Sequence, residues 1–347
     1  MSKQQDLYFP AEWHKQNFVQ LTWPHCNSDW NYMLEEVTDC FIEIAKAISQ
    51  RQKLLVITPQ KKWVELLLKN GGATMENIIV FSCLTTDTWA RDHGFITLLG
   101  KEDGKPRYVD FCFNGWGKKY EAGHDNAINK HLYASGILKG EYIDENIWVL
   151  EGGSVESDGK GTLLTTSHCL LAPNRNSMMK RNLECLLREK LHCNRVLWLD
   201  HGNLVGDDTD GHIDTIARFA PNDTIIYMAA DKDDQEQYND LSLMEGQLQE
   251  FRTASGLPYR LLALPSPKPI YDEEGLRLPA TYANFLIMND TVLYPTYAQP
   301  DNDAKAAEVL KKAFPDKEIV GVDCRPLIKQ HGSLHCVTMQ YPSPDNI

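Results

Sequence analysis

The chain has 347 residues, of which 42% are hydrophobic and 24% are charged, and this ordinary globular composition excludes a disordered chain. Its length allows two or three domains or one large repetitive domain, and a chain this long needs neither a disulfide nor a metal to be stable. The 48 acidic residues outnumber the 35 basic residues, and the net charge of −13 argues against a nucleic-acid-binding protein, which should carry a basic face.

The cysteine pattern favours a cytoplasmic protein. The nine cysteines include no Cys-x-x-Cys pair, and several lie in apolar runs, as is typical of reduced thiols that act as small buried hydrophobic groups. Residues 1–13 show no signal peptide, and no apolar run approaches the roughly 18 residues of a membrane span. We therefore expect no membrane partner.

Helices and short apolar strands alternate from the start of the chain. Apolar residues at spacings of three and four predict a helix over 34–48, with Asp29 as its N-cap. A strand over 54–58, a helix over 61–69 and a strand over 77–81 follow. The alternation continues without a low-complexity linker or a long charge block, so no domain boundary is predicted.

The second half of the chain contains an internal similarity. The segment Asn222–Tyr227 matches Asn289–Tyr294, and both begin with Asn-Asp-Thr. Each copy follows an expected apolar strand and precedes an expected acidic helix start. The strands are expected at 213–219 and 284–288, and the helix starts at 231–237 and 301–307.

A weaker copy lies earlier, at Asp158–Leu164, ahead of a helix that Asn176 is expected to cap. The aligned threonines are Thr162, Thr224 and Thr291. Turns favour Asn-Asp and Asp-Gly, so chance can produce one such match, but three copies in register favour a repeat whose length is about one fifth of the chain. We therefore expect a single domain over residues 1–347, built as a closed ring of four or five small α/β modules.

Four polar clusters interrupt the apolar strands at a similar interval. The clusters are Trp89–Asp92, Glu151–Gly153, Gly211–Asp214 and His331–Cys336. The stretch from Asp92 to Glu151 nearly equals the stretch from Glu151 to His212, and the stretch from Asp214 to Cys336 is about twice as long. If the modules surround one axis, residues at this interval project into one central site.

Each cluster also has a purely structural interpretation. Arg91-Asp92 alone is typical of a solvated ion pair, and Glu151 ahead of two glycines fits either a site at a strand end or a β-bulge with an exposed carboxylate. His212 and Asp214 alternate on an expected strand, so both side chains should point to one face, where their burial is costly without a partner or a function. For this pair, the functional interpretation is favoured over a structural His–Asp contact.

Cys336 stands out among the cysteines because it lies in a Gly/Ser loop ahead of an expected strand over 337–341. A lone cysteine is more often an inert buried residue, but the spacing of Cys336 from the His/Asp pair favours a nucleophile. A free thiol has a pKa of ~8.5, so an attacking thiolate requires a cation or hydrogen-bond donors nearby.

One mechanism that fits these residues is a metal site. Its ligands would be Cys336, His212, Asp214 and either His331 or His335. Cysteine–histidine zinc sites usually carry compact paired ligands at fixed spacings, whereas this sequence holds only one such cluster, so no metal is expected.

The other mechanism is nucleophilic catalysis, in which Cys336 attacks carbon and His212 moves protons. A surplus of nearby carboxylates is poorly suited to an anionic substrate or a peptide carbonyl. Carboxylates suit a guanidinium group, whose planar fork of N–H donors they bind in a bidentate manner. The carboxylates are Asp92, Glu151 and Asp214.

Together these motifs resemble the agmatine deiminases of the guanidine-modifying (pentein) superfamily, and Porphyromonas-type peptidylarginine deiminases share the same pattern. The matching segments are Phe9–Trp13, Trp89–Asp92, Phe113–Gly117, Leu150–Ser154, Thr209–Asp214 and Gly332–Thr338. One departure is visible, because many agmatine deiminases read Gly-Gly-Gly-Asn-Ile-His-Cys where this chain reads Gln-His-Gly-Ser-Leu-His-Cys at Gln330–Cys336. The departure concerns contacts with the tail of the substrate and not the chemistry.

The resemblance implies an α/β fold in the form of a five-bladed, pseudo-symmetric propeller of ββαβ modules around a central active site. The catalytic residues that it implies are Cys336, His212, Glu151, Asp92 and Asp214. The cysteine would be the nucleophile and the histidine the general acid/base, while the aspartates clamp the guanidinium and the glutamate orients it. Trp89 and Trp116 would complete the substrate-binding residues.

The activity that the resemblance implies is the hydrolysis of agmatine to N-carbamoylputrescine and ammonia through a covalent thiouronium, as a step of putrescine biosynthesis, with no cofactor. The expected partner is this small cationic substrate, with no nucleic acid, and a homo-oligomer is compatible with the resemblance. Alternatives are a peptidylarginine deiminase, an amidinotransferase and a non-catalytic guanidine-binding module of the same fold.

Overall fold

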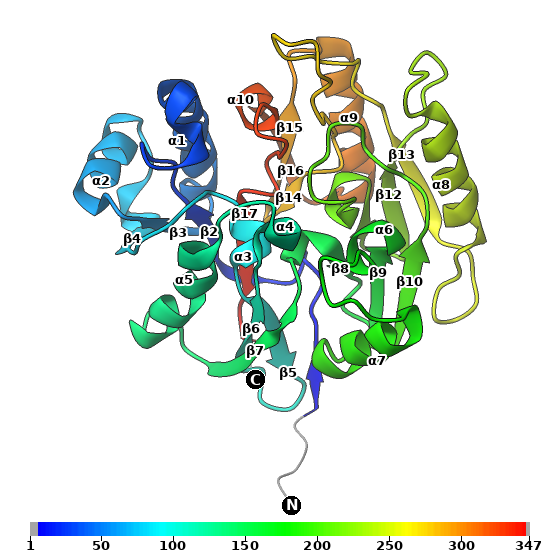
Figure 1. Ribbon diagram of the computed structural model, residues 1–347, viewed down its shortest axis with the longest axis horizontal. Helices are drawn as coiled ribbons and strands as arrows, with labels where there is room; N and C mark the ends of the chain where they lie inside the picture. The colour runs from blue at the N-terminus through cyan, green and yellow to red at the C-terminus, as the bar shows by residue number, and fades with distance from the viewer. Residues whose placement is uncertain (1–5, 345–347) are drawn as a thin grey trace, which may run out of the picture.

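The computed structural model describes residues 6–344, whose strands form five separate sheets (Figure 1). In their order within each sheet the strands are β1 (Leu7–Tyr8), β5 (Ile96–Gly100), β6 (Pro106–Cys112) and β7 (Glu141–Val149); β10 (Arg195–Leu199), β9 (Thr162–Thr166) and β8 (Val155–Ser157); β11 (Ala217–Ala220), β12 (Thr224–Met228) and β13 (Arg260–Leu264); β14 (Leu286–Ile287), β15 (Thr291–Thr296) and β16 (Glu318–Asp323); and β17 (Thr338–Pro342), β2 (Gln16–Thr22), β3 (Lys53–Thr58) and β4 (Ile78–Ser82).

The longer helices lie at the periphery of the molecule, with most strands toward its middle (Figure 1). The α-helices are α1 (Leu34–Ser49), α2 (Lys61–Asn70), α3 (Ala90–His93), α4 (Gly115–Lys118), α5 (Gly123–Ala134), α6 (Ser167–Leu170), α7 (Lys180–Lys190), α8 (Tyr238–Glu250), α9 (Pro300–Ala313) and α10 (Arg325–Ile328). Short 3-10 helices are η1 (Asp29–Met33), η2 (Met75–Asn77), η3 (Gly152–Ser154) and η4 (Ile213–Thr215). None of the helices described is both long and apolar enough to cross a membrane.

All five sheets share one pattern of strand pairing. In each sheet one strand pairs antiparallel with one neighbour and parallel with the other; these strands are β6, β9, β12, β15 and β2. The aligned threonines of the sequence repeat, Thr162, Thr224 and Thr291, are the first residues of β9, β12 and β15. The internal similarity therefore marks equivalent strands of three sheets, and the mixed α/β class is confirmed.

The first long helix, α1, shows how the amphipathic pattern becomes packing. Val37, Phe41, Ile44 and Ile48 are fully buried in the largest apolar cluster, as their spacing predicts. The prediction that Asp29 caps this helix is wrong. Asp29 begins the separate 3-10 turn η1, which buries Trp30, and α1 starts only after that turn.

Other predicted boundaries within the repeat also differ from the structure. The strand expected over 213–219 is interrupted, because residues 213–215 form η4 and only β11 is extended. The strand expected over 284–288 is reduced to β14. Asn176 does not cap α7; its side chain instead bonds the backbone of Val149, as donor at 2.8 Å and acceptor at 2.9 Å. Residues 231–237 form turns ahead of α8, since Asp234 there pairs with Arg277.

Equivalent positions of four of the five sheets carry the polar clusters of the sequence. The short segments α3, η3, η4, residues 280–285 and residues 331–337 lie at most two residues ahead of β5, β8, β11, β14 and β17. Each of those strands is the antiparallel partner in its sheet. The near-constant interval between the clusters therefore reflects one position repeated in successive sheets.

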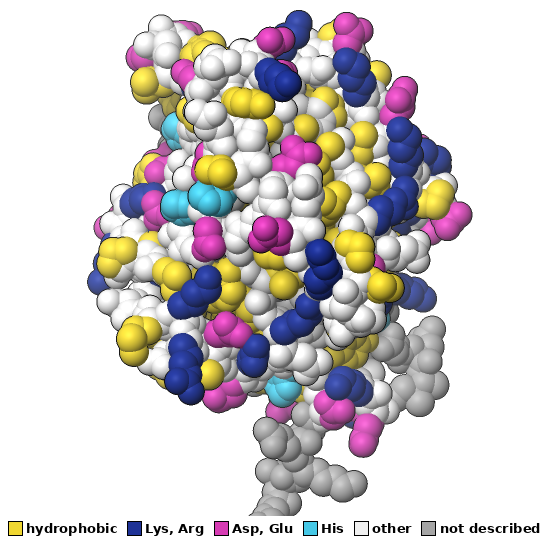
Figure 2. Space-filling view, turned by 90° about the vertical axis from the view of Figure 1, so that its right-hand side faces the viewer, with side chains coloured by type: hydrophobic (Ala, Val, Ile, Leu, Met, Phe, Trp, Pro, Cys, Tyr) yellow, Lys and Arg dark blue, Asp and Glu magenta, His cyan; other side chains and the backbone are white. Residues whose placement is uncertain are grey.

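The surface on the side of α8 carries mixed charge. Figure 2 shows Lys and Arg side chains interspersed with Asp and Glu side chains over this face. Such mixing is typical of a water-exposed surface and differs from the basic stripe that binds nucleic acids.

Candidate active site

The structure brings the five predicted catalytic residues together in the interior. Asp92 lies in α3, Glu151 directly precedes η3, His212 directly precedes η4, Asp214 lies within η4, and Cys336 precedes β17. All five are buried, and Cys336, with 5% of its surface exposed, is the most accessible. Burial of so many ionisable groups is costly unless they are paired or bind a ligand.

Gly153 lies where three of these side chains converge. A Cβ atom at this position would lie 2.6 Å from His212 Nδ1, 2.9 Å from Asp92 Oδ1 and 3.2 Å from Asp214 Oδ2. The Gly153 N–H donates to Asp92 Oδ1 at 3.0 Å. Only glycine allows this approach, as the Glu151-Gly152-Gly153 pattern predicts, and the alternative of a β-bulge with an exposed glutamate is wrong because Glu151 is fully buried.

Asp92 is a buried carboxylate without a cationic partner among the described residues. Trp116 Nε1 donates to its Oδ2 at 2.9 Å. Burial, and then the neighbouring carboxylates of Asp214 and Glu151, raise the pKa of Asp92 well above its ordinary value. The interpretation of Arg91-Asp92 as a solvated ion pair is therefore wrong, and Arg91 donates instead to Gln340 Oε1 at 2.6 Å.

Glu151 has one engaged oxygen and one free oxygen. Arg175 Nε donates to Glu151 Oε1 at 2.8 Å, and Arg175 Nη1 donates to Asp210 Oδ2 at 2.6 Å. Glu151 Oε2 is buried and has no hydrogen-bond partner in the part of the chain that the structure describes. Burial raises the pKa of Glu151 in spite of the opposing charge of Arg175. The free oxygen is available to a ligand.

His212 has no hydrogen-bond partner for either ring nitrogen among residues 6–344. Its Nδ1 lies 3.6 Å from Asp92 Oδ1. Burial lowers the pKa of His212 to about 4, so the ring is neutral near pH 7 and can accept a proton. The predicted alternation of His212 and Asp214 on a strand is wrong, because η4 begins between them, yet both side chains still converge on Gly153.

Asp214 belongs to a buried network of ion pairs. His335 Nδ1 lies 2.6 Å from Asp214 Oδ2, and His335 Nε2 lies 2.7 Å from Glu12 Oε2. Arg218 donates to Glu12 at 2.6 Å and to Glu156 at 2.9 Å. The ring of His335 therefore bridges two carboxylates, with Nδ1 toward Asp214 and Nε2 toward Glu12. Although burial acts to raise it, the pKa of Asp214 is lowered by the hydrogen bond and charge of His335.

The Cys336 thiol lies beside the side-chain oxygen of Asn284. Asn284 Oδ1 accepts from the backbone N–H of Cys336 at 3.3 Å and from its Sγ at 3.4 Å. The amide nitrogen of Asn284 donates to the backbone carbonyl of Asp214 at 3.2 Å, which ties the nucleophile loop to η4. Burial, and then the charges of Asp214 and Asp92, raise the pKa of Cys336 well above its ordinary value. The thiol is therefore neutral until a cation enters.

A small cavity of ≈ 30 Å³ opens onto Cys336 and Asp92. Trp89 and Trp116, the predicted substrate contacts, line it with their rings at 76° to each other. Its acidic lining residues apart from Asp92 are Asp29, Asp87 and Asp208. The cavity therefore offers aromatic faces and a second group of carboxylates beside the nucleophile.

The structure does not assemble the metal site considered from the sequence. His335 is engaged at both nitrogens, by Asp214 and Glu12. His331 lies with its Nδ1 2.8 Å from the carbonyl oxygen of Gly206.

Four residues at the site escaped the sequence interpretation. They are Glu12, Arg175, Arg218 and Asn284. Glu12 lies within the matched segment Phe9–Trp13, and Asn284 precedes β14 as Cys336 precedes β17, so the motif and the repeat carried a signal for these two. The two arginines carried none, because nothing local distinguishes a buried arginine from an exposed one.

Comparisons with known proteins place the chain in a family. The model of the Porphyromonas-type peptidyl-arginine deiminase family matches residues 8–342. The chain is 31% identical to the agmatine deiminase of Stutzerimonas stutzeri, over 99% of this chain and 97% of that protein.

Solved structures are similar over nearly the whole chain. A Porphyromonas gingivalis protein proposed to be an arginine deiminase is 50% identical, with a TM-score of 0.91 over 97% of this chain and 99% of that chain. A cysteine-to-serine variant of the C. jejuni agmatine deiminase, solved with substrate bound, is 37% identical, with a TM-score of 0.90 over 99% of this chain and 98% of that chain. An amidinotransferase from Microseira wollei, at 12% identity and a TM-score of 0.52 over 98% of this chain and 99% of that chain, shows a shared fold alone.

Proposed function

We propose, because the chain belongs to the Porphyromonas-type peptidyl-arginine deiminase family, that it is a hydrolase of a guanidinium C–N bond that converts agmatine to N-carbamoylputrescine and ammonia. The observation that carries the proposal is that Asp92 and Asp214 converge with His212 on Gly153, with the buried Glu151 beside His212 and the Cys336 thiol within the field of both aspartates. Three buried carboxylates beside a thiol suit a cationic, planar group with several N–H donors.

In this proposal the guanidinium binds between Asp92 and Asp214. The ionised form of Asp92 is destabilised by burial and by the neighbouring carboxylates of Asp214 and Glu151. A bound cation relieves that repulsion. Asp214 Oδ1 and Glu151 Oε2 are buried and have no hydrogen-bond partner among the described residues. The N–H groups of the substrate would donate hydrogen bonds to these two oxygens.

The cation also prepares the nucleophile. In the free site, the Cys336 thiol and the His212 ring are both neutral. The positive charge favours the thiolate, and His212 accepts the thiol proton. The thiolate forms a bond to the guanidinium carbon, and one C–N bond breaks as His212 returns the proton to the departing ammonia.

A covalent S-alkylthiouronium remains on Cys336. His212 then removes a proton from water, the resulting hydroxide adds to the same carbon, and the C–S bond breaks to release the ureido product. The proton of the added hydroxyl passes to the departing sulfur, and His212 releases to solvent the proton that it took from water, so both groups return to their neutral starting forms.

The second group of carboxylates supports agmatine over the alternative substrates. Asp29, Asp87 and Asp208 line the cavity that leads to Cys336, and because Asp208 is paired with Lys119 at 3.2 Å, Asp29 and Asp87 would supply the negative charge for the distal ammonium of agmatine. The carboxylate of free arginine would be repelled, and an arginine within a peptide has no second cation. Burial raises the pKa of Asp87 to about 6, and a nearby ammonium would favour its ionised form.

The proposal includes finer features that follow from the family resemblance. The five sheets would form a closed five-bladed ring, and residues 1–347 would act as one catalytic domain. We further propose a cytoplasmic location, a place in putrescine biosynthesis, assembly as a homo-oligomer, and substrate contacts from Trp89 and Trp116.

An ammonia-release panel tests the proposed substrate. Agmatine, free arginine and a peptide with an internal arginine are supplied at equal concentration, and we expect ammonia from agmatine alone. Preference for the peptide would make the chain a peptidylarginine deiminase. If little ammonia is released and the amidino group is transferred to an added amine, the chain is an amidinotransferase.

A further inference from the structure

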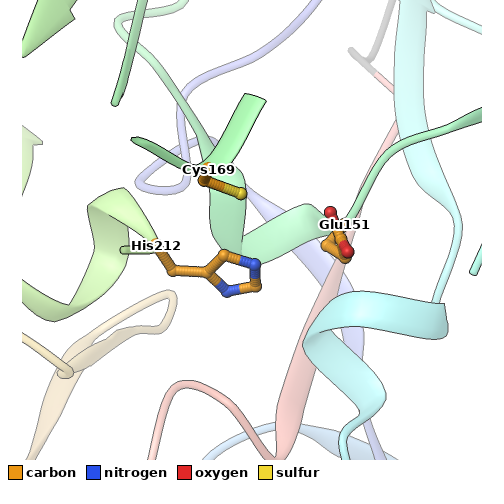
Figure 3. A group of neighbouring side chains, drawn as sticks. All are labelled: Glu151, Cys169 and His212. Carbon is orange, nitrogen blue, oxygen red and sulfur yellow. The ribbon is translucent and has the colours of Figure 1, made fainter. Parts of the chain in front are cut away.

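Cys169 lies beside the proposed catalytic residues His212 and Glu151, although the mechanism does not use it. It belongs to α6 and is fully buried. One donor atom from each of the three residues, a thiol sulfur, a ring nitrogen and a carboxylate oxygen, lies within 4.8 Å of the others. Figure 3 shows the imidazole of His212 directed between the other two side chains.

Two of the three residues have unused polar atoms at this point. His212 Nδ1 and Nε2 and Glu151 Oε2 are buried and have no hydrogen-bond partner among residues 6–344. Buried polar atoms without partners are rare and mark places where a ligand supplies the missing contacts. The proposed substrate satisfies them at the guanidinium side, whereas Cys169 faces them from α6.

We propose that Cys169, His212 and Glu151 form a binding site for a zinc-class divalent cation that inhibits the enzyme. The inhibition rests on the proposed function, because the metal takes the atoms of His212 and Glu151 that the reaction requires. Sulfur, imidazole and carboxylate together suit Zn²⁺ or Co²⁺, while a thiolate is a poor ligand for Mg²⁺ or Ca²⁺.

The geometry requires only a modest contraction. Zinc bonds of about 2.0–2.3 Å place tetrahedral ligand atoms roughly 3.3–3.7 Å apart, so donors within 4.8 Å must close by about 1 Å. Three protein ligands leave the fourth position to water, which is the usual composition of an open zinc site.

Charge also balances at this position. Binding of the dication to the Cys169 thiol releases its proton to solvent and forms a metal–thiolate bond, and the Glu151 carboxylate supplies the second negative charge. Arg175, the cation next to Glu151, keeps Asp210 as a partner at 2.6 Å. The metal and its ligands are therefore neutral as a unit.

The site predicts competition with the substrate. A metal on His212 blocks proton transfer, and a metal on the Glu151 carboxylate competes with the guanidinium for that group. Agmatine should therefore protect the enzyme from Zn²⁺, and a chelator should restore activity.

Co²⁺ binding distinguishes this site from an alternative metal site that includes the nucleophile Cys336. We expect the wild type and Cys336→Ser to bind one Co²⁺ and to show thiolate-to-cobalt charge-transfer absorption, and Cys169→Ser to lose that absorption. Absorption that survives in Cys169→Ser and disappears in Cys336→Ser would overturn the proposal. Because Cys336→Ser needs no turnover, this result is independent of the proposed reaction.

The companion measurement is inhibition by Zn²⁺. Cys169→Ser should keep basal ammonia release and require at least tenfold more Zn²⁺ for half inhibition than the wild type. Cys193→Ser, which changes another buried free cysteine, is the matched control and should be inhibited like the wild type. Equal Zn²⁺ sensitivity of Cys169→Ser and the wild type would overturn the proposal.

Discussion

Two walls of buried charge meet at Cys336. The network wall consists of Glu12, Glu156, Arg218, Asp214 and His335. The open wall consists of Asp92, Glu151 and His212. In the network wall each carboxylate lies 2.6–2.9 Å from a nitrogen of Arg218 or His335. In the open wall Glu151 is paired with Arg175 through one oxygen, but Asp92 faces other carboxylates, and both nitrogens of His212 lack hydrogen-bond partners among the described residues.

From this difference we infer that the network wall has a structural role, as a frame, and that the open wall binds the substrate. Apart from one oxygen of Asp214, the carboxylates of the network wall are paired within it, so it holds its geometry without a ligand. The open wall keeps unmet hydrogen bonds and like charges close together, which costs stability until a cation with N–H donors binds. Asp214 joins the two walls, because one of its oxygens is held by His335 and the other is free.

The largest effect is expected at the point where the walls meet. Cys336→Ala should lower ammonia release by about 10⁴-fold or more, because no other group takes the place of the nucleophile. Agmatine binding, measured by calorimetry, should persist because both walls remain. Turnover close to that of the wild type would refute the assignment of the nucleophile.

Breaking the network wall should reduce stability. Glu12→Gln removes the carboxylate that Arg218 and His335 share, so the buried network loses one negative charge while Arg218 keeps Glu156 as a partner, and we expect the free energy of unfolding to fall by about 3–5 kcal/mol. Urea denaturation measures this loss. The control is Glu36→Gln, which removes the surface partner of Lys329 and should cause no measurable change. If the two variants had equal free energies of unfolding, the network wall would not stabilise the fold.

Protonating the open wall should also reduce stability. The pKa of His212 is about 4 in the folded state against 6.5 for the ordinary group, so below pH 6.5 the unfolded chain binds a proton that the folded chain does not. Stability contributed by neutral His212 is thus present above pH 6.5 and is lost toward pH 4, by about 3 kcal/mol. His212→Asn should lack this part of the pH dependence in urea denaturation. Parallel pH curves for the two proteins would contradict a buried neutral ring.

Neutralising the open wall should separate activity from stability. Asp92→Asn removes a substrate contact, and we expect kcat/KM for agmatine to fall by about 100-fold. The free energy of unfolding should not fall, because the substitution also removes repulsion from Asp214 and Glu151. A loss of stability as large as that of Glu12→Gln would mean that Asp92 has a structural role instead.

The smallest expected effect is the difference in kcat/KM between two substitutions of His335. Asparagine places its amide nitrogen near the position of Nδ1 and preserves the bond to Asp214, whereas glutamine places it near Nε2 and preserves the bond to Glu12. If His335 acts on the reaction by orienting Asp214, His335→Asn should retain about tenfold more kcat/KM than His335→Gln. Equal activities, or the reverse order, would mean that the histidine serves only the frame.

The sequence anticipated the residues of the open wall better than those of the network wall. Asp92, Glu151 and His212 recur at one interval because they occupy equivalent turns of successive sheets, and a sequence repeat shows that interval directly. Glu12 and His335 meet across 323 residues of sequence, and no local pattern indicates such a pair. Arg218 stands within a strand whose alternation alone does not show that both of its faces are covered.

Local geometry was harder to predict than location. His212 and Asp214 reach the site through a 3-10 turn and not through strand alternation, because η4 interrupts the apolar run ahead of β11. Asn176 was expected to cap a helix but is used to anchor Val149, since a tertiary contact competes with the local one.

The pairing of β17 with β2 fixes the order in which the molecule can become active. Tyr341 donates to Gln20 across 321 residues of sequence, and Cys336 lies immediately ahead of that closing strand. Pairing of such distant segments closes a loop of nearly the whole chain, and we predict that it forms after the more local pairings of the other sheets. The other sheets can therefore assemble while the thiol is still away from its partners, and a reactive centre exists only after the two distant segments have joined.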